Sequence, residues 1–228
     1  MLANAAHSNR APAGHSGSSL AGRRRARPPF PSPPTMHTAH FHPDDAADAA
    51  MHVFWQKGYA ATSIQDLVDG TGLSRSSLYN TFESKHGLFQ HALRRYHCQT
   101  AANVALLAED GPAIARVRAL LQQIADDELA GAACCGCLVA NTALELGGRD
   151  GTVNSLLQEH FATLETALTA LMQRGQQQGE IAAGKSPVAL ARFLVATIQG
   201  LRVLGRGYEG EAQAQRLQDV IEVALAAL

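Results

Sequence analysis

The sequence predicts an all-α protein in which a small N-terminal helical domain precedes a larger helical bundle. Two observations support this prediction. Apolar residues recur with the helical period along most of the chain after residue 42, and residues typical of helix caps, with glycines between them, divide that pattern into segments. The chain has 228 residues, of which 46% are hydrophobic. A chain of this size can bury a substantial core in one or two domains.

The N-terminal 40 residues differ in composition from the rest of the chain. They are rich in Pro, Ser, Gly and Ala, and they include RPPFPSPPT at 27–35. Such a segment cannot bury enough apolar surface to offset the entropy of ordering, so residues 1–40 are predicted to form a disordered tail. Residues 1–43 hold no Asp or Glu and 5 of the 19 basic residues, so the remainder has 14 basic and 20 acidic residues. The RRRAR run would attract nucleic acid non-specifically. Alternatively, translation starts at Met36 and the tail is a gene-boundary error.

The first helix is predicted over about 43–57. Pro43 and two aspartates occupy its first turn, where the helix dipole favours negative charge, and Gly58 follows its last turn. Its apolar positions follow the spacing i, i+3, i+4 and i+7: Ala47, Ala50, Met51 and Phe54.

Two short helices and the start of a longer one are predicted next. Thr62 stands three residues before Gln65, which predicts a capping box, and the helix that follows ends at the Gly-Thr-Gly of residues 70–72. Ser74 is expected to cap a third helix that runs to about Phe82, and a serine at position 84 is expected to cap a fourth.

Two short helices joined by a glycine-containing turn form a helix-turn-helix, and the second of them has the residue types that DNA reading requires. A helix in the major groove needs short outward side chains and a few hydrogen-bonding groups. Arg75 can pair with guanine or phosphate, Ser76 and Ser77 can bond to base edges, and Tyr79 and Asn80 can reach phosphate or adenine. Residues 57–95 contain five basic and three acidic side chains, so charge alone does not identify this site.

The segment FWQKGYAATSIQDLVDGTGLSRSSLYNTFESKHGLFQHAL, residues 54–93, resembles the DNA-binding domain of the TetR/AcrR family of transcriptional regulators. The resemblance implies a DNA-binding domain over 41–97 and a helical domain for ligand binding and dimerisation over 98–228. It also implies a homodimer that binds a palindromic double-stranded DNA operator, usually as a repressor that a small-molecule effector releases. The positions that it places toward DNA are Thr62, Ser63, Arg75, Ser76, Ser77, Tyr79, Asn80 and Lys85.

Two later helices carry apolar seams. The helix predicted over 152–178 has apolar residues spaced 4, 3, 4 and 3 apart, and the helix over 187–205 has a similar series. The first seam comprises Leu157, Phe161, Leu164, Leu168 and Leu171, and the second comprises Ala191, Leu194, Ile198 and Leu201. Two seams from each subunit can form a four-helix interface about a two-fold axis. The alternative is that both seams pack within one monomer.

Three of the four cysteines, Cys134, Cys135 and Cys137, lie within four positions. A closed zinc site needs four ligands, and no second C-x-x-C or paired histidine follows at zinc spacing, so neither a metal nor a cofactor is predicted. Gly131 and Gly136 place the thiols near a helix start, where the dipole lowers thiol pKa. Since a related branch of the family releases DNA on cysteine oxidation or electrophile modification, a thiol or metal sensor is an alternative. Packed core is another.

Cys137, Asn141 and Glu145 are four residues apart and form one polar stripe on an otherwise apolar helix. Buried polar groups need partners. The stripe therefore either lines an effector pocket or bonds to neighbouring helices as a structural network. Together with Cys134 and Cys135, these residues are the candidate effector or sensor site.

The remaining expectations concern location and catalysis. No run approaches the roughly 18 apolar residues of a membrane span, and the Arg-rich start lacks a signal-peptide apolar region, so a cytoplasmic protein without a membrane partner is expected. A helical-bundle enzyme is a remote alternative, because the sequence shows no nucleophile–base motif and no phosphate-binding loop.

Overall fold

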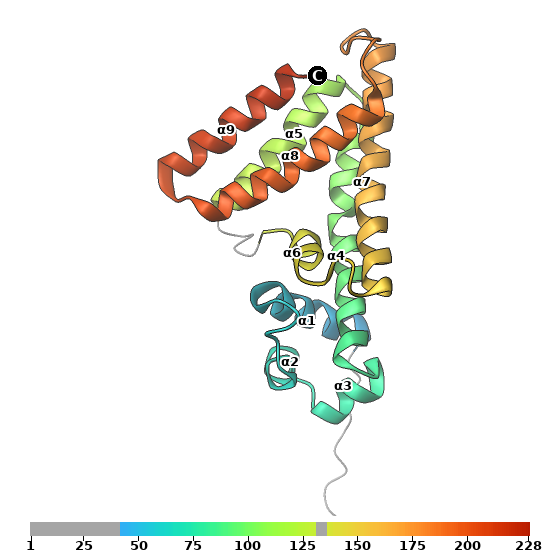
Figure 1. Cartoon of the computed structure of the whole chain (residues 1–228), viewed down its shortest axis with the longest axis vertical. Helices are drawn as coiled ribbons and strands as arrows, with labels where there is room; N and C mark the ends of the chain where they lie inside the picture. The colour runs from blue at the N-terminus through green and yellow to red at the C-terminus, as the bar shows by residue number, and fades with distance from the viewer. Residues whose placement is uncertain (1–41, 131–135) are drawn as a thin grey trace, which may run out of the picture. The chain divides into compact units, whose positions relative to one another are not determined.

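The computed structural model describes residues 42–130 and 136–228, and within these ranges it contains nine α-helices and no strand (Figure 1). The predicted all-α class is confirmed. The helices are α1 (Pro43–Lys57), α2 (Ile64–Thr71), α3 (Arg75–Phe82), α4 (Lys85–Ala108), α5 (Ala113–Leu129), α6 (Leu138–Leu146), α7 (Gly151–Gln177), α8 (Pro187–Gly207) and α9 (Gly210–Ala226). The predicted tail, and Cys134 and Cys135, lie outside the described residues.

The N-terminal helices share a core built on aromatic packing. Phe54 of α1 meets Phe89 of α4 edge to face, with ring centroids 4.9 Å apart, and both side chains are buried. Leu67 of α2 and Leu78 of α3 close the same core from the other side. Each such side chain contributes about 1.5–3 kcal/mol by leaving water, so this core fixes how α2 and α3 lie on α4.

The start of α2 differs from the predicted capping box. The N-cap is Ser63, whose hydroxyl accepts a hydrogen bond from the Asp66 amide, while the Asp66 carboxylate accepts one from the Ser63 amide. Thr62 instead donates its hydroxyl to the Gly58 carbonyl oxygen at 2.6 Å. The expectation that Thr62 pairs with Gln65 is therefore wrong, because the hydroxyl of Thr62 is engaged with the end of α1.

The predicted starts of α3 and α4 are confirmed. Ser74 and Ser84 are their N-caps, and each hydroxyl accepts a hydrogen bond from the amide three residues later. A side chain at Gly87 would place its Cβ 2.1 Å from the Phe82 carbonyl oxygen, so only glycine permits this close approach of α4 to the end of α3. Helix α4 continues without a break through residues 97 and 98, where the domain boundary is predicted.

The C-terminal bundle of α5, α7, α8 and α9 has its own core, to which Leu106 and Leu107 at the C-terminal end of α4 also contribute. Both predicted seams pack inside this monomer. On α8, Ala191, Leu194 and Leu201 are fully buried, and on α7 Leu168 and Leu171 are buried against the same core. Helices of the same chain therefore cover these seam residues, because a heptad-like spacing buries a face equally well within a monomer. The predicted dimer through α7 and α8 stays a prediction, and it requires other faces of these helices.

Helix α8 is also the one helix, among the residues that the structure describes, that is long and apolar enough to cross a membrane by length and composition alone. Core helices of soluble proteins meet the same criterion. In this fold α8 packs against α5, α7 and α9, which explains its apolar character.

Candidate functional site

Helix α3 has one buried and one exposed face. Leu78 and Phe82 point into the N-terminal core, whereas Arg75, Tyr79 and Asn80 are exposed. The Arg75 guanidinium lies 5.8 Å from the centroid of the Tyr79 ring, and Tyr79 is 37% exposed. The exposed face therefore offers a cation, a phenol and an amide on one short helix, which are groups that can bond to phosphates and base edges.

The serines at the start of α3 form a small network. The Ser74 hydroxyl oxygen lies 2.9 Å from that of Ser76 and 2.8 Å from that of Ser77, and it also accepts the Ser77 amide. Ser76 is exposed and Ser77 is half-buried. Their hydroxyls are held close to the helix N-terminus, where a phosphate oxygen would be favoured.

The predicted DNA-contacting residues that precede and follow α3 differ in exposure. Thr62 is 2% exposed, so its side chain does not face outward, whereas Ser63 is exposed at the N-cap of α2. The Lys85 ammonium lies 4.6 Å from the centroid of the Tyr59 ring. Burial lowers the pKa of Lys85, and the negative charges of Glu145 and Asp66 act against that shift.

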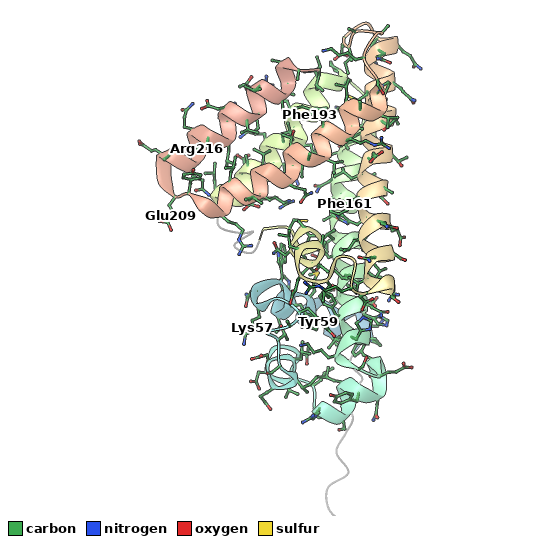
Figure 2. The ribbon with its side chains drawn as sticks, in the orientation of Figure 1. Lys57, Tyr59, Phe161, Phe193, Glu209 and Arg216 are labelled. Atoms are coloured by element: carbon green, nitrogen blue, oxygen red, sulfur yellow. The ribbon has the colours of Figure 1, made fainter. Side chains whose placement is uncertain are left out.

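Helix α6 is bonded at both ends to the N-terminal helices. At its far end, the Glu145 carboxylate accepts hydrogen bonds from the backbone amides of Tyr59, at 2.9 Å, and Ala60, at 2.5 Å. Before its start, the Gly136 carbonyl accepts the Trp55 indole N–H at 3.0 Å. Tyr59, labelled in Figure 2, lies in the turn between α1 and α2. Glu145 therefore ties α6 to the turn between α1 and α2.

The predicted polar stripe of α6 is divided between two roles. Cys137 is buried, its sulfur caps the helix by accepting the Ala140 amide at 3.5 Å, and it lines a cavity. Glu145 belongs to the network with Tyr59 and Ala60 and does not line that cavity. Asn141, between them, is half-buried. Cys137 thus faces a cavity, whereas Glu145 bonds to neighbouring elements as part of a structural network.

The cavity lies between α4, α7 and α8, next to the start of α6, and has a volume of about 130 Å³. Polar side chains line it from α4, α7, α8 and the N-cap of α6: Tyr96, His97, Thr100, Asn103, Cys137, His160, Thr163, Gln199 and Arg202. No local sequence pattern predicts this set, because its members are up to about a hundred residues apart, and only Cys137 is among the predicted site residues. No group of three His, Cys, Asp or Glu suited to a metal occurs within 42–130 and 136–228.

Charge on the cavity wall is largely compensated. Arg202 donates to the carboxylate of Glu128 at 3.3 Å, and both side chains are buried. Burial raises the pKa of Glu128, and Arg202 opposes that shift. Burial also lowers the pKa of His160 to about 4, with further lowering from His97 and Arg202. His160 is therefore neutral at pH 7.

The lowered pKa of His160 predicts a pH-dependent loss of stability. Unfolded His160 takes up a proton below about pH 6.5 while the folded residue resists protonation until about pH 4, so its contribution is full above 6.5 and falls as pH drops toward 4. Between pH 7 and 4, the wild-type protein should lose about 3 kcal/mol more unfolding free energy than His160→Gln. Urea denaturation of both proteins at several pH values measures this difference. Parallel pH profiles would contradict the buried, neutral imidazole.

Comparison with known proteins identifies the fold. Residues 47–92 match the model of the tetR family of bacterial regulatory proteins, and residues 113–221 match the tetracyclin repressor-like C-terminal domain. The HTH-type transcriptional repressor ComR of Escherichia coli (strain K12) is 33% identical over 180 residues, which cover 78% of this chain and 85% of that protein. The chain belongs to the TetR family. The predicted resemblance is thereby confirmed.

Other TetR-family proteins agree over similar lengths. The uncharacterized regulator YezE of Bacillus subtilis (strain 168) is 31% identical over 78% of this chain and 92% of its own length. A solved structure of the TetR-family regulator CifR, a cysteine mutant complexed with a 26-bp double-strand operator DNA, is 29% identical. It covers 90% of this chain and 99% of its own, with a TM-score of 0.72.

A thiol or metal sensor gains no support from these comparisons or from the described cysteines. Of those, Cys137 is buried and Cys98 is exposed on α4. TetR-family proteins are transcriptional regulators, which leaves the helical-bundle enzyme without support as well.

Proposed function

We propose that this protein is a DNA-binding transcriptional repressor that reads its operator with α3. The observation that supports this most directly is the exposed row on α3, Arg75, Tyr79 and Asn80, on a helix held by a buried face against α2 and α4. The relationship to the repressor ComR and the operator complex of CifR support the same function.

In this proposal α3 enters the major groove and its flanks hold the phosphate backbone. Arg75 pairs with guanine or phosphate, and Ser76, Ser77 and Asn80 bond to nearby base edges. Lys85 and the exposed N-terminus of α2 at Ser63 contact phosphates on either side. Thr62 takes part only by fixing the turn between α1 and α2, since its side chain is buried.

A palindromic operator requires a two-fold symmetric dimer. We infer that the dimer uses the outer face of α8, because both predicted seams are already buried in the monomer. Phe193 is 43% and Val203 66% exposed on this face, with the small residues Ala196 and Gly200 also on it (Figure 2 labels Phe193). Exposed apolar side chains beside small ones allow close helix packing across an interface.

If the dimer uses the outer face of α8, a charge introduced on that face should weaken the dimer. Phe193→Arg should raise the dimer dissociation constant at least about 100-fold, because a guanidinium buried without a partner costs several kcal/mol. Sedimentation equilibrium of the wild type and the variant measures this. The matched control is Leu144→Arg on α6, a leucine 87% exposed and away from α8, which should leave the dimer intact. A dimer equally stable in both variants would place the interface elsewhere.

We also propose that a small-molecule effector releases the repressor, which acts in the cytoplasm. The cavity is the candidate effector site, since Cys137 at the start of α6 lines it while Glu145 at the other end of α6 holds the turn before α2. An occupant that displaces α6 would shift the turn that positions α2 and α3.

Selection of DNA by the purified full chain tests the proposed function. Sheared genomic DNA from the source organism is incubated with the protein, and the retained fragments are sequenced. An inverted repeat should be enriched near a small number of genes, and Arg75→Ala should abolish the enrichment. Retention of random fragments, equal for wild type and variant, would contradict sequence-specific repression.

A further inference from the structure

The cavity contains a hydrogen-bond acceptor for which the described residues, 42–130 and 136–228, supply no donor. Gln199 of α8 lines the cavity, and its side-chain oxygen is buried and accepts no hydrogen bond from any residue that the structure describes. A buried amide oxygen without a donor costs about 1–3 kcal/mol. Buried polar atoms of this kind are uncommon, and a ligand or an ordered water is the usual partner.

The charged and titratable groups Arg202 and His160 do not favour a charged occupant. Thr100, Asn103 and Thr163 add only neutral polar groups to the wall. The positive charge of Arg202 is compensated by Glu128 at 3.3 Å, and the His160 imidazole is neutral at pH 7. A carboxylate ligand would have to give up its hydration without an uncompensated cation to replace it. A cationic ligand would meet Arg202 with no free carboxylate on the wall.

The size and the remaining lining favour a compact apolar body. A volume of about 130 Å³ is close to that of cavities that bind benzene, which are about 150 Å³. Val104, Leu164 and Ile198 supply apolar walls, and the rings of His97 and His160 meet edge to face with centroids 5.4 Å apart. Flat ligands of six to eight heavy atoms suit such a space.

We propose that the cavity binds a small uncharged molecule in which one hydroxyl group stands on an apolar ring or short chain, and that this hydroxyl donates its hydrogen bond to Gln199. The proposal rests on the proposed function only in taking this cavity as the effector site. The aromatic surfaces of His97 and His160 then pack against the apolar body of the ligand.

Three probes of equal ring size test the ligand class by calorimetry on the full chain. Phenol carries the ring and a hydroxyl donor, benzene lacks the donor, and benzoate carries an anionic acceptor. Phenol should bind one per protomer and about tenfold more tightly than benzene, because only phenol satisfies Gln199. Benzoate should bind more weakly than phenol. Equal affinity for phenol and benzene, or tighter binding of benzoate, would overturn the proposal.

The variant Gln199→Leu locates the interaction. It should remove the preference for phenol over benzene and raise the thermal midpoint of the ligand-free protein, since the unpaired oxygen is gone. Gln173→Leu, at an exposed position of α7 outside the cavity, is the matched control and should keep the preference. A preference retained by Gln199→Leu would overturn the assignment.

Operator binding separates this proposal from the proposed function. If phenol binds in the predicted way and the operator complex does not dissociate, the ligand class stands and the effector role of the cavity fails. If the ligand-free protein does not bind an operator at all, the repressor function fails, while the calorimetric comparison of the three probes still decides the ligand class.

Discussion

Replacing Arg75 with alanine should weaken operator binding by about 5- to 150-fold, which corresponds to the 1–3 kcal/mol of a bidentate contact to guanine. Arg75 is exposed at the first position of α3, so its removal leaves no cavity and exposes no core. The thermal midpoint should therefore stay unchanged within error. Fluorescence anisotropy with labelled operator, at one fixed salt concentration, measures the affinity.

The matched control is Arg94→Ala, which removes the same charge from an exposed position on α4 two and a half turns beyond Lys85. It should change affinity much less than Arg75→Ala. Tyr79→Phe, which removes one hydroxyl from the same face of α3, should cause a smaller loss than Arg75→Ala. Unchanged affinity for both α3 variants would show that another element reads the operator.

Replacing Glu145 with alanine should loosen the link between α6 and the helix-turn-helix. The carboxylate accepts the amides of Tyr59 and Ala60, so its removal leaves the half-buried Tyr59 amide without a partner from α6. The free energy of unfolding should fall by about 2 kcal/mol. Amide hydrogen exchange at Tyr59 and Ala60 should accelerate, which NMR or mass spectrometry measures.

Glu159→Ala, at an exposed position of α7, controls for the loss of one negative charge. It should leave both stability and exchange at Tyr59 unchanged. If Glu145→Ala exchanges these two amides as slowly as wild type does, the turn is held by other contacts, and α6 does not carry a signal from the cavity.

The predicted features that proved correct depend on local chemistry. Ser74 and Ser84 specify the starts of α3 and α4 through hydrogen bonds made within one helical turn, and Pro43 favours the start of α1 through its fixed backbone angle, so the neighbouring sequence determines all three. The exposed face of α3 follows from the same periodicity that buries Leu78. Both kinds of signal are contained in fewer than ten consecutive residues.

The features that were missed or left open depend on contacts between distant segments. Thr62 and Ser63 are both acceptable caps in sequence, and only the bond from Thr62 to Gly58 selects Ser63. The seams of α7 and α8 have the spacing of an interface, but spacing does not say whether the partner helix belongs to the same chain. The cavity brings His97, His160 and residues of α8 together from three helices, which no local pattern reports.

The ratio of two affinities measures sequence-specific DNA binding through α3. The full chain is titrated onto its operator and onto a scrambled duplex of the same length and composition, in the same salt. The wild-type protein should prefer the operator at least about 1,000-fold. Arg75→Ala should lower this ratio by a larger factor than it lowers the affinity for scrambled DNA. A ratio near one for the wild-type protein would contradict sequence-specific binding.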